Sequence, residues 1–297
     1  MILTLSNLSG SAGKSTTLIE IARIAADHGY RVLVVDADAN QTATSWLDAE
    51  PSPGQLTVSD VLLARLGTGH EVAVAAVVAA TSLPGVHIIP ATVALGTDAL
   101  GLLHQTAGDR RLALALNSLT PVYDLILVDS PGSPTAVPLI MNALTAATHT
   151  LTVFAPGTKE KGGIDAWMKT VDEVRIGTNP GLTVAGIVPC AVPPANAGRD
   201  YADNLRAVQE AYPDLTTPTI RRSVTVEAAF KRRRPLRTTD PVHTDYLAVW
   251  DWLTTHTLTL SRMVASHDPA RGADPHTPST QSGSLDRNDG SSPLDTP

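Results

Sequence analysis

Cysteine and aromatic residues are scarce in this sequence. Cys190 is the single cysteine among 297 residues, so the chain cannot form an intramolecular disulfide, and a cysteine-rich zinc or iron–sulfur site is excluded. Aromatic residues account for 4% of the chain, whereas hydrophobic residues of all kinds account for 43%. We therefore expect a core built from Val, Leu, Ile and Ala, in a protein of the reducing cytoplasm.

Long apolar segments are also lacking. The longest uninterrupted apolar run, Val72–Ala80, is far shorter than the roughly 20 residues that a membrane-spanning helix requires. The first residues, MILTLSNLSG, lack the basic region that opens a secretory signal, and they are typical of a first strand. The segment DYLAVWDWLTTHTLTLSRMV carries too few cations for an amphipathic membrane anchor. We predict a protein with no membrane partner.

Short apolar runs alternate with helix-length segments along most of the chain. Several runs, such as VLVV and LILV, are apolar throughout, as expected of parallel strands that helices cover on both faces. The pattern predicts an α/β fold with a doubly wound, mostly parallel sheet flanked by helices. The expected strands are Ile2–Leu5, Arg31–Val35, Val86–Ile89, Leu125–Val128, Leu151–Phe154 and Leu182–Val188. The expected helices are Lys14–His28, Thr57–Leu66, Val93–Leu119, Thr135–Ala147, Gly162–Arg175, Tyr201–Ala211, Val224–Lys231 and His243–Leu260.

The last part of the chain differs in composition from the rest. From about Ser266 onward the residues are mainly Pro, Ser, Thr, Gly and Asp, and aromatic residues are absent. Such a segment cannot bury enough apolar surface to offset the entropy lost on ordering it. We therefore predict one domain over residues 1–265 and a disordered tail over residues 266–297.

A glycine-rich turn joins the first expected strand to the first expected helix. Backbone N–H groups converge in such a turn, and the helix dipole adds to their attraction for a phosphate. Lys14 would reach the β- and γ-phosphates and the Ser15 hydroxyl would bind Mg²⁺, although Leu8 stands where the strict G-x4-G-K-[ST] pattern has its first glycine. Taken alone, the turn is also compatible with an ordinary helix start and a solvated lysine. The candidate phosphate-binding residues are Gly10, Ser11, Ala12, Gly13, Lys14, Ser15 and Thr16.

Three aspartates stand at the carboxyl ends of two buried strands. RVLVVDAD ends in Asp36 and Asp38, and YDLILVDSPG carries Asp129 at the end of its apolar run. Each carboxylate alone could be an ordinary turn or helix-capping residue. Together, beside a phosphate loop and at the edge where open α/β sheets bind ligands, they indicate a site for Mg²⁺ and a hydrolytic water.

At these residues the sequence resembles the ParA/MinD superfamily of deviant Walker ATPases, a group of P-loop NTPases, and most closely the ParA-type plasmid and chromosome partition ATPases. The resemblance covers roughly residues 2–253. GSAGKSTT is similar to the family's phosphate loop, VLVVDADANQTAT to its next strand and loop, and YDLILVDSPGSP to its Walker B strand. Weaker similarity extends through HIIPATVAL, the strand end at Val153–Pro156, AGIVPCAV and IRRSVTVEAAFKRRRPL.

The resemblance implies a role for each residue of the site. Lys14 would contact the phosphates, Ser15 would bind Mg²⁺ and Thr16 would contact the α-phosphate. Asp38 would position the attacking water, while Asp36 and Asp129 would hold Mg²⁺ through its water ligands. The implied activity is ATP hydrolysis, slow and stimulated by a partner, with ATP and Mg²⁺ bound and without a covalent intermediate.

The sequence departs from the family pattern at several positions. Ser9 stands where the family loop has a lysine that reaches the partner's nucleotide in an ATP-bound dimer, and such a trans-acting cation is worth about 10³–10⁵ in rate. Lys159 and Lys161 are the nearest candidates by topology to replace it. The remaining departures are Ala39 for the family proline, Gln41 for its glycine and Cys190 for an asparagine that reads adenine.

Cations concentrate in one segment of an otherwise acidic chain, whose net charge is −7. A cluster of this kind can bind DNA phosphates without reading the bases, or it can be a solvated helix end whose arginines pair with nearby carboxylates. ParA-type proteins carry DNA-binding basic residues in this region. The candidate DNA-binding residues are Arg221, Arg222, Lys231, Arg232, Arg233, Arg234 and Arg237.

The leading hypothesis is a ParA-like ATPase of the bacterial cytoplasm that associates with the nucleoid. Its partners would be a second copy in an ATP-dependent homodimer, non-specific double-stranded DNA and a ParB-type centromere-binding protein. One alternative is a biosynthetic P-loop ligase of the dethiobiotin or cobyrinate synthase type. Another, which Ser9 motivates, is a degenerate nucleotide-dependent switch with little hydrolysis.

Overall fold

A computed structural model describes residues 1–7, 13–64, 72–133, 135–157 and 160–258 of the protein. The predicted tail over residues 266–297 lies outside these ranges, as do Gly10, Ser11 and Ala12 of the phosphate loop. No helix within the described ranges is long and apolar enough to cross a membrane.

A seven-stranded sheet forms the centre of the molecule, in the order β3-β4-β2-β5-β1-β6-β7. Every neighbouring pair is parallel except β3 and β4. The predicted α/β fold with a doubly wound, mostly parallel sheet is therefore confirmed. The strands are β1 (Ile2–Leu5), β2 (Val32–Asp36), β3 (Ala79–Ala80), β4 (Val86–Ile89), β5 (Leu125–Asp129), β6 (His149–Phe154) and β7 (Thr183–Pro189).

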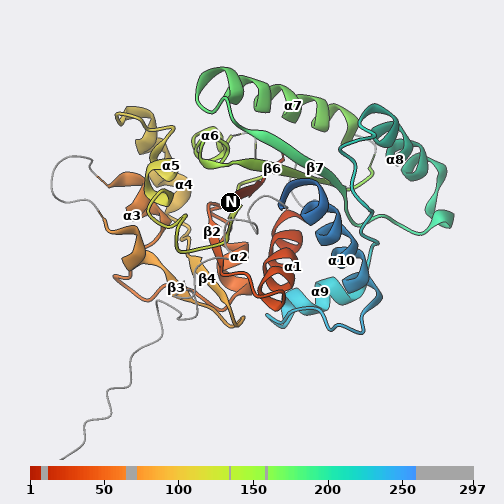
Figure 1. Ribbon diagram of the computed structural model, residues 1–297, viewed down its shortest axis with the longest axis horizontal. Coiled ribbons are helices and arrows are strands. Elements are labelled where there is room, and N and C mark those ends of the chain that lie inside the picture. The colour runs from red at the N-terminus through yellow and green to blue at the C-terminus, as the bar shows by residue number, and fades with distance from the viewer. Residues whose placement is uncertain (8–12, 65–71, 134, 158–159, 259–297) are drawn as a thin grey trace, which may run out of the picture.

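Helices connect the strands and cover both faces of the sheet (Figure 1). The α-helices are α1 (Lys14–Asp27), α2 (Thr42–Trp46), α3 (Val58–Leu63), α4 (Leu95–Asp98), α5 (Arg111–Leu116), α6 (Val137–Ala146), α7 (Glu160–Gly177), α8 (Arg199–Ala211), α9 (Val224–Lys231) and α10 (Pro241–Leu253). Short 3₁₀ segments are η1 (Val74–Val77), η2 (Ala99–His104) and η3 (Ala195–Ala197), and the π-helical turn η4 (Thr254–Leu258) follows α10.

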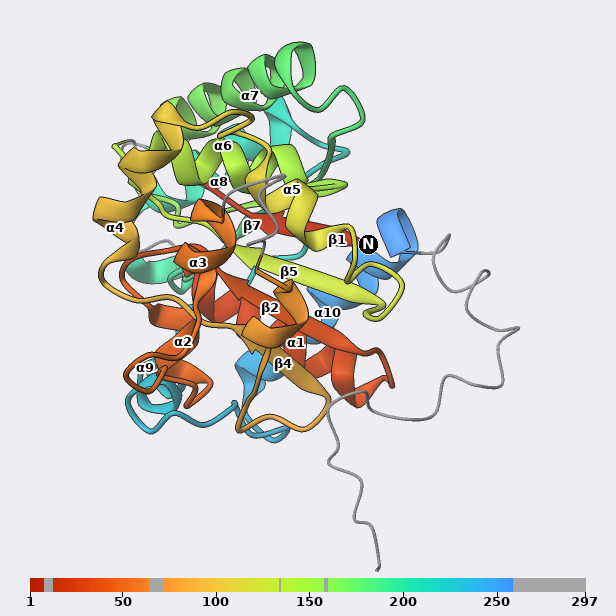
Figure 2. The same ribbon diagram turned by 90° about the vertical axis from the view of Figure 1, so that its left-hand side faces the viewer.

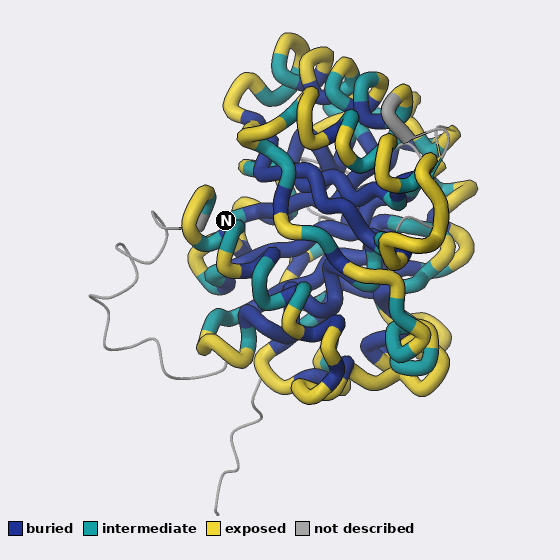
Figure 3. Tube along the Cα trace, turned by 90° about the vertical axis from the view of Figure 1, so that its right-hand side faces the viewer, coloured by how far each residue is buried: buried dark blue, intermediate teal, exposed yellow. Residues whose placement is uncertain are grey.

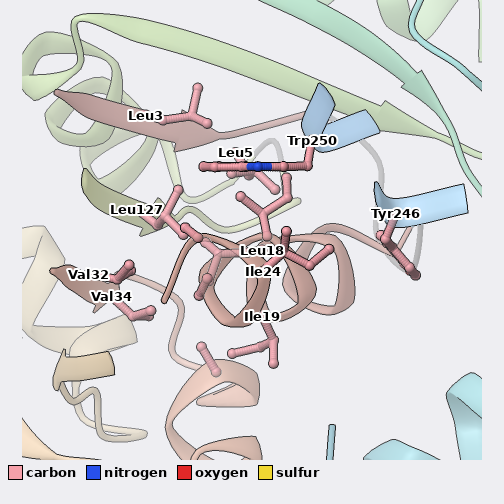
Figure 4. Close-up of a cluster of buried hydrophobic side chains, with 14 of the residues drawn as sticks. Leu3, Leu5, Leu18, Ile19, Ile24, Val32, Val34, Leu127, Tyr246 and Trp250 are labelled. Carbon is pink, nitrogen blue, oxygen red and sulfur yellow. The ribbon is translucent and has the colours of Figure 1, made fainter. Parts of the chain in front are cut away.

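Side chains that alternate along a strand pack into two separate apolar layers. Leu3 and Leu5 of β1 pack with α1 and α10, including Trp250, in the cluster drawn in Figure 4. Ile2 of the same strand faces the other layer, which α3, α5 and α6 cover. Figure 3 shows the strands as a buried slab with exposed backbone mostly on the surrounding helices and loops. Because both faces are covered, continuous apolar strands are favoured over alternating ones.

One predicted helix is wrong. The segment Val93–Leu119 forms α4, η2 and α5 instead of a single helix. Ala107 adopts a left-handed backbone with φ 54°, and a Cβ at Gly108 would collide with the carbonyl oxygen of Leu102. The chain therefore turns sharply before Arg111, which a continuous helix does not allow. The short elements β3 and α2 were not predicted.

Candidate nucleotide site and basic segment

The carboxyl ends of β1, β2 and β5 meet at one edge of the sheet. Leu5, the last residue of β1, pairs with Asp129 of β5, and Asp129 in turn pairs with Asp36 of β2. Helix α1 begins at the same edge, with Gly13 as its N-cap residue in the left-handed region at φ 86°. The predicted phosphate lysine and the predicted carboxylates are therefore brought together.

Lys14 lies in the first turn of α1 and is only 7% exposed. Its Nζ donates a hydrogen bond of 2.7 Å to Oδ1 of Asn7, whose Nδ2 donates to the carbonyl oxygen of Val153 at 2.8 Å. Burial lowers the pKa of Lys14, and the negative charges of Asp129 and Asp38 oppose this effect. The ammonium is thus held by one neutral oxygen, and a phosphate would provide a much stronger partner.

Asp129 is buried without adequate hydrogen bonding. It is 1% exposed, and neither carboxylate oxygen has a partner of acceptable geometry among the described residues. Burial raises its pKa to about 8, with a further rise from the charge of Asp36, while the nearby Ser15 hydroxyl and the Lys14 charge act in the opposite direction. An unsatisfied buried carboxylate is costly, so its presence beside a lysine indicates a place for a bound group.

Asp36 is buried as well, but its oxygens are engaged. Oδ2 accepts from the backbone N and the Oγ1 of Thr44 at 2.8 and 2.7 Å, and Oδ1 accepts from the backbone N of Asp38 at 3.1 Å. Burial still raises its pKa to about 6, because these bonds compensate only in part. Asp36 therefore fixes both the Asp38 loop and the start of α2.

A cavity of about 820 Å³ opens above these carboxylates. Asp38 lines it, and its Oδ1 accepts from the backbone N of Asn40 at 3.0 Å. Lys14 is the only lysine or arginine among the described residues of the lining. The lining residues are Gly13, Lys14, Ser15, Thr16, Asp38, Ala39, Asn40, Thr42, Gly96, Ala99, Leu100, Pro131, Gly132, Ser133, Thr135, Ala136, Pro138 and Leu139.

The oxygen atoms at this edge fit Mg²⁺ bound together with phosphate. Within the described ranges no group of three or more His, Cys, Asp or Glu side chains could hold a metal ion. Mg²⁺ commonly keeps several waters and takes one or two carboxylates plus the phosphates of its substrate. The Ser15 hydroxyl and the unsatisfied Asp129 carboxylate are suited to such a partial set of ligands.

Cys190, at the position expected to read adenine, lies beside Gly13 at the start of α1. It is 5% exposed, and a Cβ placed on Gly13 would lie 2.7 Å from its Sγ. Burial raises the pKa of the thiol to about 11. Ser9, Lys159 and the side chain of Lys161 lie outside what the structure describes.

The predicted DNA-binding residues divide into two groups. Arg221 pairs with both carboxylate oxygens of Asp245, at 2.6 and 2.7 Å. Arg237 pairs with Asp240 at 3.3 Å, and Arg233 pairs with Asp48 and Glu50 at 2.9 and 2.6 Å. These three side chains are already partly neutralised by carboxylates.

The remaining cations of the segment are exposed. Lys231, Arg232 and Arg234 have no ion-pair partner within the described ranges, and they lie at the end of α9 and just after it. Arg222 lies over the ring of Tyr201, 5.9 Å from its centroid, an arrangement that leaves its charge in place.

Comparison with known proteins identifies the family. A family model, AAA_31, described as an AAA domain, matches residues 1–184. The chain belongs to this family. It is also 32% identical over 192 residues to the chromosome partitioning protein ParA of Caulobacter vibrioides, a match that covers 63% of this chain and 68% of that protein. The predicted membership among ParA/MinD-type P-loop ATPases is confirmed, and ATP hydrolysis is indicated for the family as a whole.

Solved structures of proteins bound to ATP or an ATP analog share the fold. The ATP complex of a Cyanothece McdA variant has a TM-score of 0.75 at 21% identity, covering 86% of this chain and 95% of that chain. Cobyrinic acid a,c-diamide synthase from Mycobacterium smegmatis, with an ATP analog and magnesium bound, has a TM-score of 0.66 at 28% identity. That match covers 78% of this chain and 92% of the synthase.

The sequence reasoning missed two residues of this candidate site. Asn7, which holds Lys14, lies two residues after the end of β1, and a polar residue close to a strand end was the available signal. Thr44 holds Asp36 from the start of α2, a helix too short to be recognised from periodicity.

Proposed function

We propose that this AAA_31 family member is a partition-type ATPase that binds Mg-ATP, dimerises, binds DNA without sequence preference and hydrolyses ATP to move DNA. One observation carries the proposal: Lys14, Ser15 and the unsatisfied carboxylate of Asp129 meet below a cavity that Asp38 lines. The arrangement provides a cation for the phosphates of Mg-ATP and a carboxylate for its Mg²⁺.

Each site residue would have its own role in phosphoryl transfer to water. Lys14 would leave Asn7 and donate to the β- and γ-phosphates, while the backbone around Gly13 receives the phosphate at the start of α1. Bound Mg²⁺ would neutralise the charge that develops on the phosphates, with Ser15 and Asp129 as the nearest ligands and Asp36 contributing through water. Asp38, at the cavity wall, would orient the attacking water.

Apolar side chains around the cavity support dimerisation. Leu100 lines the cavity and is 58% exposed, and Val137, next to two lining residues, is 52% exposed. Leu103 of η2 and Val93 are 67% and 73% exposed. A second copy that covers this face would bury these side chains and close the nucleotide from water.

The unpaired cations at the end of α9 support DNA binding. Lys231, Arg232 and Arg234 are exposed and have no ion pair with any residue that the structure describes, whereas Arg221, Arg233 and Arg237 pair with carboxylates. Two such clusters in a dimer would bind much more tightly than one, because the second contact becomes intramolecular. A ParB-type partner that binds the centromere would stimulate hydrolysis and release the complex. The relatives that are named chromosome partitioning proteins suggest such a partner.

The first experiment is duplex DNA binding by the purified protein with ATP, ADP or no nucleotide, at low and moderate salt. Binding that requires ATP, weakens steeply with salt and persists in Asp38→Ala is the expected result. Binding that is absent or independent of nucleotide would contradict the proposal.

The residues of the DNA surface are tested by removing the unpaired cations. Lys231→Ala with Arg232→Ala and Arg234→Ala should reduce the slope of log K against log salt by about 3 per protomer, since each phosphate contact contributes about 0.9. A matched variant, Lys169→Ala with Arg199→Ala and Arg206→Ala, loses three exposed cations on α7 and α8 and should retain the slope. Equal losses in both variants would show that overall charge is responsible.

A second candidate is a biosynthetic ligase, which the match to cobyrinic acid a,c-diamide synthase favours. Such an enzyme must bind a carboxylate substrate beside ATP, yet Lys14 is the only cation among the described lining residues. ATP turnover that depends on a small carboxylic acid and is indifferent to DNA would favour the ligase. ATP binding without phosphate release under any condition would instead favour the degenerate switch that Ser9 motivates.

A further inference from the structure

Helix α2 ends in an unusual way for a helix so close to the nucleotide site. The backbone N of Ala49 donates to the carbonyl of Thr44 at 3.1 Å, and the N of Asp48 donates to Ser45 at 3.3 Å. This pair of bonds is a Schellman motif, which places the residue after the C-cap in the left-handed region. That residue is normally glycine, but here it is Asp48, with φ 55°. Helix α1 ends in the same motif with Gly29 at that position.

Helix α9 ends with the same departure from glycine. The backbone N of Arg234 donates to the carbonyl of Ala229 at 3.1 Å, and the N of Arg233 donates to Phe230 at 3.0 Å. Arg233 occupies the left-handed position at φ 49°. A branched or long side chain is disfavoured there, so the surrounding contacts must hold both Asp48 and Arg233 in place.

The two strained residues are bonded to each other. Arg233 Nη1 lies 2.9 Å from Oδ1 of Asp48, and its Nη2 lies 2.6 Å from Oε1 of Glu50. Beneath this ion pair the rings of Trp46 and Phe230 meet edge to face, with centroids 5.2 Å apart. We call these five residues the clasp. Figure 2 shows that α2 and α9 lie side by side at the clasp.

The other end of α2 is attached to the nucleotide site. Thr44 donates its backbone N and its hydroxyl to Asp36, which also accepts from the backbone N of Asp38. Gln41, the residue before α2, is left-handed as well, at φ 55°. A five-residue helix thus spans the distance between the loop that carries Asp38 and the segment that carries the cations. Movement of that loop cannot leave α9 unaffected unless the clasp yields.

We infer that the clasp is a regulatory contact, through which the state of the nucleotide site sets how the cations at the end of α9 are presented to DNA. The inference rests on the function proposed above. In the arrangement seen here Asp48 and Glu50 neutralise Arg233 and hold the chain from Phe230 to Arg234 against α2. Binding of Mg-ATP at Asp36 and Asp38 shifts α2, weakens the ion pair and releases Arg233 to join the unpaired cations.

The test compares the wild type with Asp48→Gly combined with Glu50→Gln. Glycine suits the left-handed position, so this variant keeps the end of α2 while losing both carboxylates. A control, Asp245→Asn with Asp203→Asn, also removes two negative charges and frees Arg221 of the same segment, but it does not touch α2. Each protein is measured for DNA binding with and without Mg-ATP, and for amide hydrogen exchange over residues 14–20 and 228–236.

The expected result is specific to the clasp variant. Its DNA affinity without nucleotide should rise, and the ratio of affinities with and without Mg-ATP should fall about fivefold or more, as expected when a coupling is lost. The control should gain affinity in both conditions and keep the ratio. In the wild type, Mg-ATP should change exchange over residues 228–236, and the clasp variant should lose this change while residues 14–20 remain protected.

The other outcomes distinguish a failure of the coupling from a failure of the proposed function. Protection of residues 14–20 with no change over 228–236 in the wild type would overturn the coupling and leave nucleotide binding intact. A change in exchange over residues 228–236 that disappears in the clasp variant would support the coupling, even if neither the wild type nor the variants bound DNA. The lack of DNA binding would then contradict only the proposed DNA binding. Absence of protection at residues 14–20 would overturn both.

Discussion

The buried carboxylates at the edge of the sheet determine how the nucleotide-free protein responds to pH. Burial raises the pKa of Asp129 to about 8 and that of Asp36 to about 6, both from an ordinary value of 3.8. Between the ordinary and the raised pKa the folded state holds protons that the unfolded chain has released. The contribution of these two carboxylates to the free energy of unfolding should therefore decrease as the pH rises from 4 to 8.

Asp129→Asn should remove most of this dependence, because the amide stays neutral at every pH. At pH 8 the nucleotide-free variant should melt about 4 °C or more above the wild type, while its stabilisation by Mg-ATP should be lost. Thermal unfolding from pH 5 to pH 8, with and without Mg-ATP, measures both effects. Asp200→Asn changes an exposed carboxylate and serves as the control. A lower melting temperature for Asp129→Asn at pH 8 would contradict the argument.

Gly13→Ala should impair both folding and phosphate binding. The alanine must adopt φ 86°, which costs about 1–2 kcal/mol, and its Cβ would press on Sγ of Cys190. Adding Cys190→Ala to this variant should recover the part due to the collision and leave the part due to the backbone. Unfolding free energies of the two single variants and the double variant give the coupling between the residues. A coupling of zero would show that the two residues are not in contact.

At the scale of elements, the anchoring of the basic segment to α1 depends on a buried ion pair. Glu20 of α1 is fully buried, accepts from Arg23 at 2.9 Å, and also accepts from the backbone N of Leu236 at 3.1 Å. Arg23→Met should destabilise the protein by about 3–5 kcal/mol, because Glu20 would lose its buried counter-charge. Denaturant unfolding measures this loss. Arg206→Met removes one side of an exposed pair with Asp203 and should change stability by less than about 1 kcal/mol.

The sequence predicted helices and strands correctly where a whole segment is buried. It failed where a few local contacts determine the backbone conformation. The strands β1, β2 and β5 were found because helices on both faces bury every residue, so that most of them are apolar. Helix α2 has five residues and is held by Asp36 and by the clasp, neither of which leaves a periodic pattern. The single helix predicted for Val93–Leu119 failed because the turn at Gly108 depends on packing against Leu102.

At the scale of the whole molecule, dimerisation through the cavity face can be separated from nucleotide binding. Leu103→Arg with Val137→Arg should place two charges in the proposed interface and abolish the ATP-dependent dimer, with ATP affinity for the monomer changed by less than about threefold, because neither residue lines the cavity. Sedimentation with and without Mg-ATP measures the mass. Ile176→Arg, on an α7 side chain that is 86% exposed and does not line the cavity, should dimerise normally. A persistent dimer in the double variant would place the interface elsewhere.

The sequence predicted the components of the nucleotide site better than those of the basic segment. Lys14, Asp36, Asp38 and Asp129 lie at strand and helix ends, and a parallel sheet brings such ends to one edge. In contrast, the carboxylates that pair with Arg233 come from residues more than 180 positions earlier, so chain order could not show which cations are already neutralised. That information exists only in the folded chain.

The contact between Cys190 and the phosphate loop also provides an internal reporter. Because the chain has one cysteine, a thiol reagent can react at a single place, which is buried against Gly13 and Thr17. Alkylation requires a local opening that exposes Cys190, so its rate measures that opening without a mutation. A bound nucleotide that stabilises the start of α1 would slow the reaction, and mass spectrometry would follow this change through the unmodified fraction.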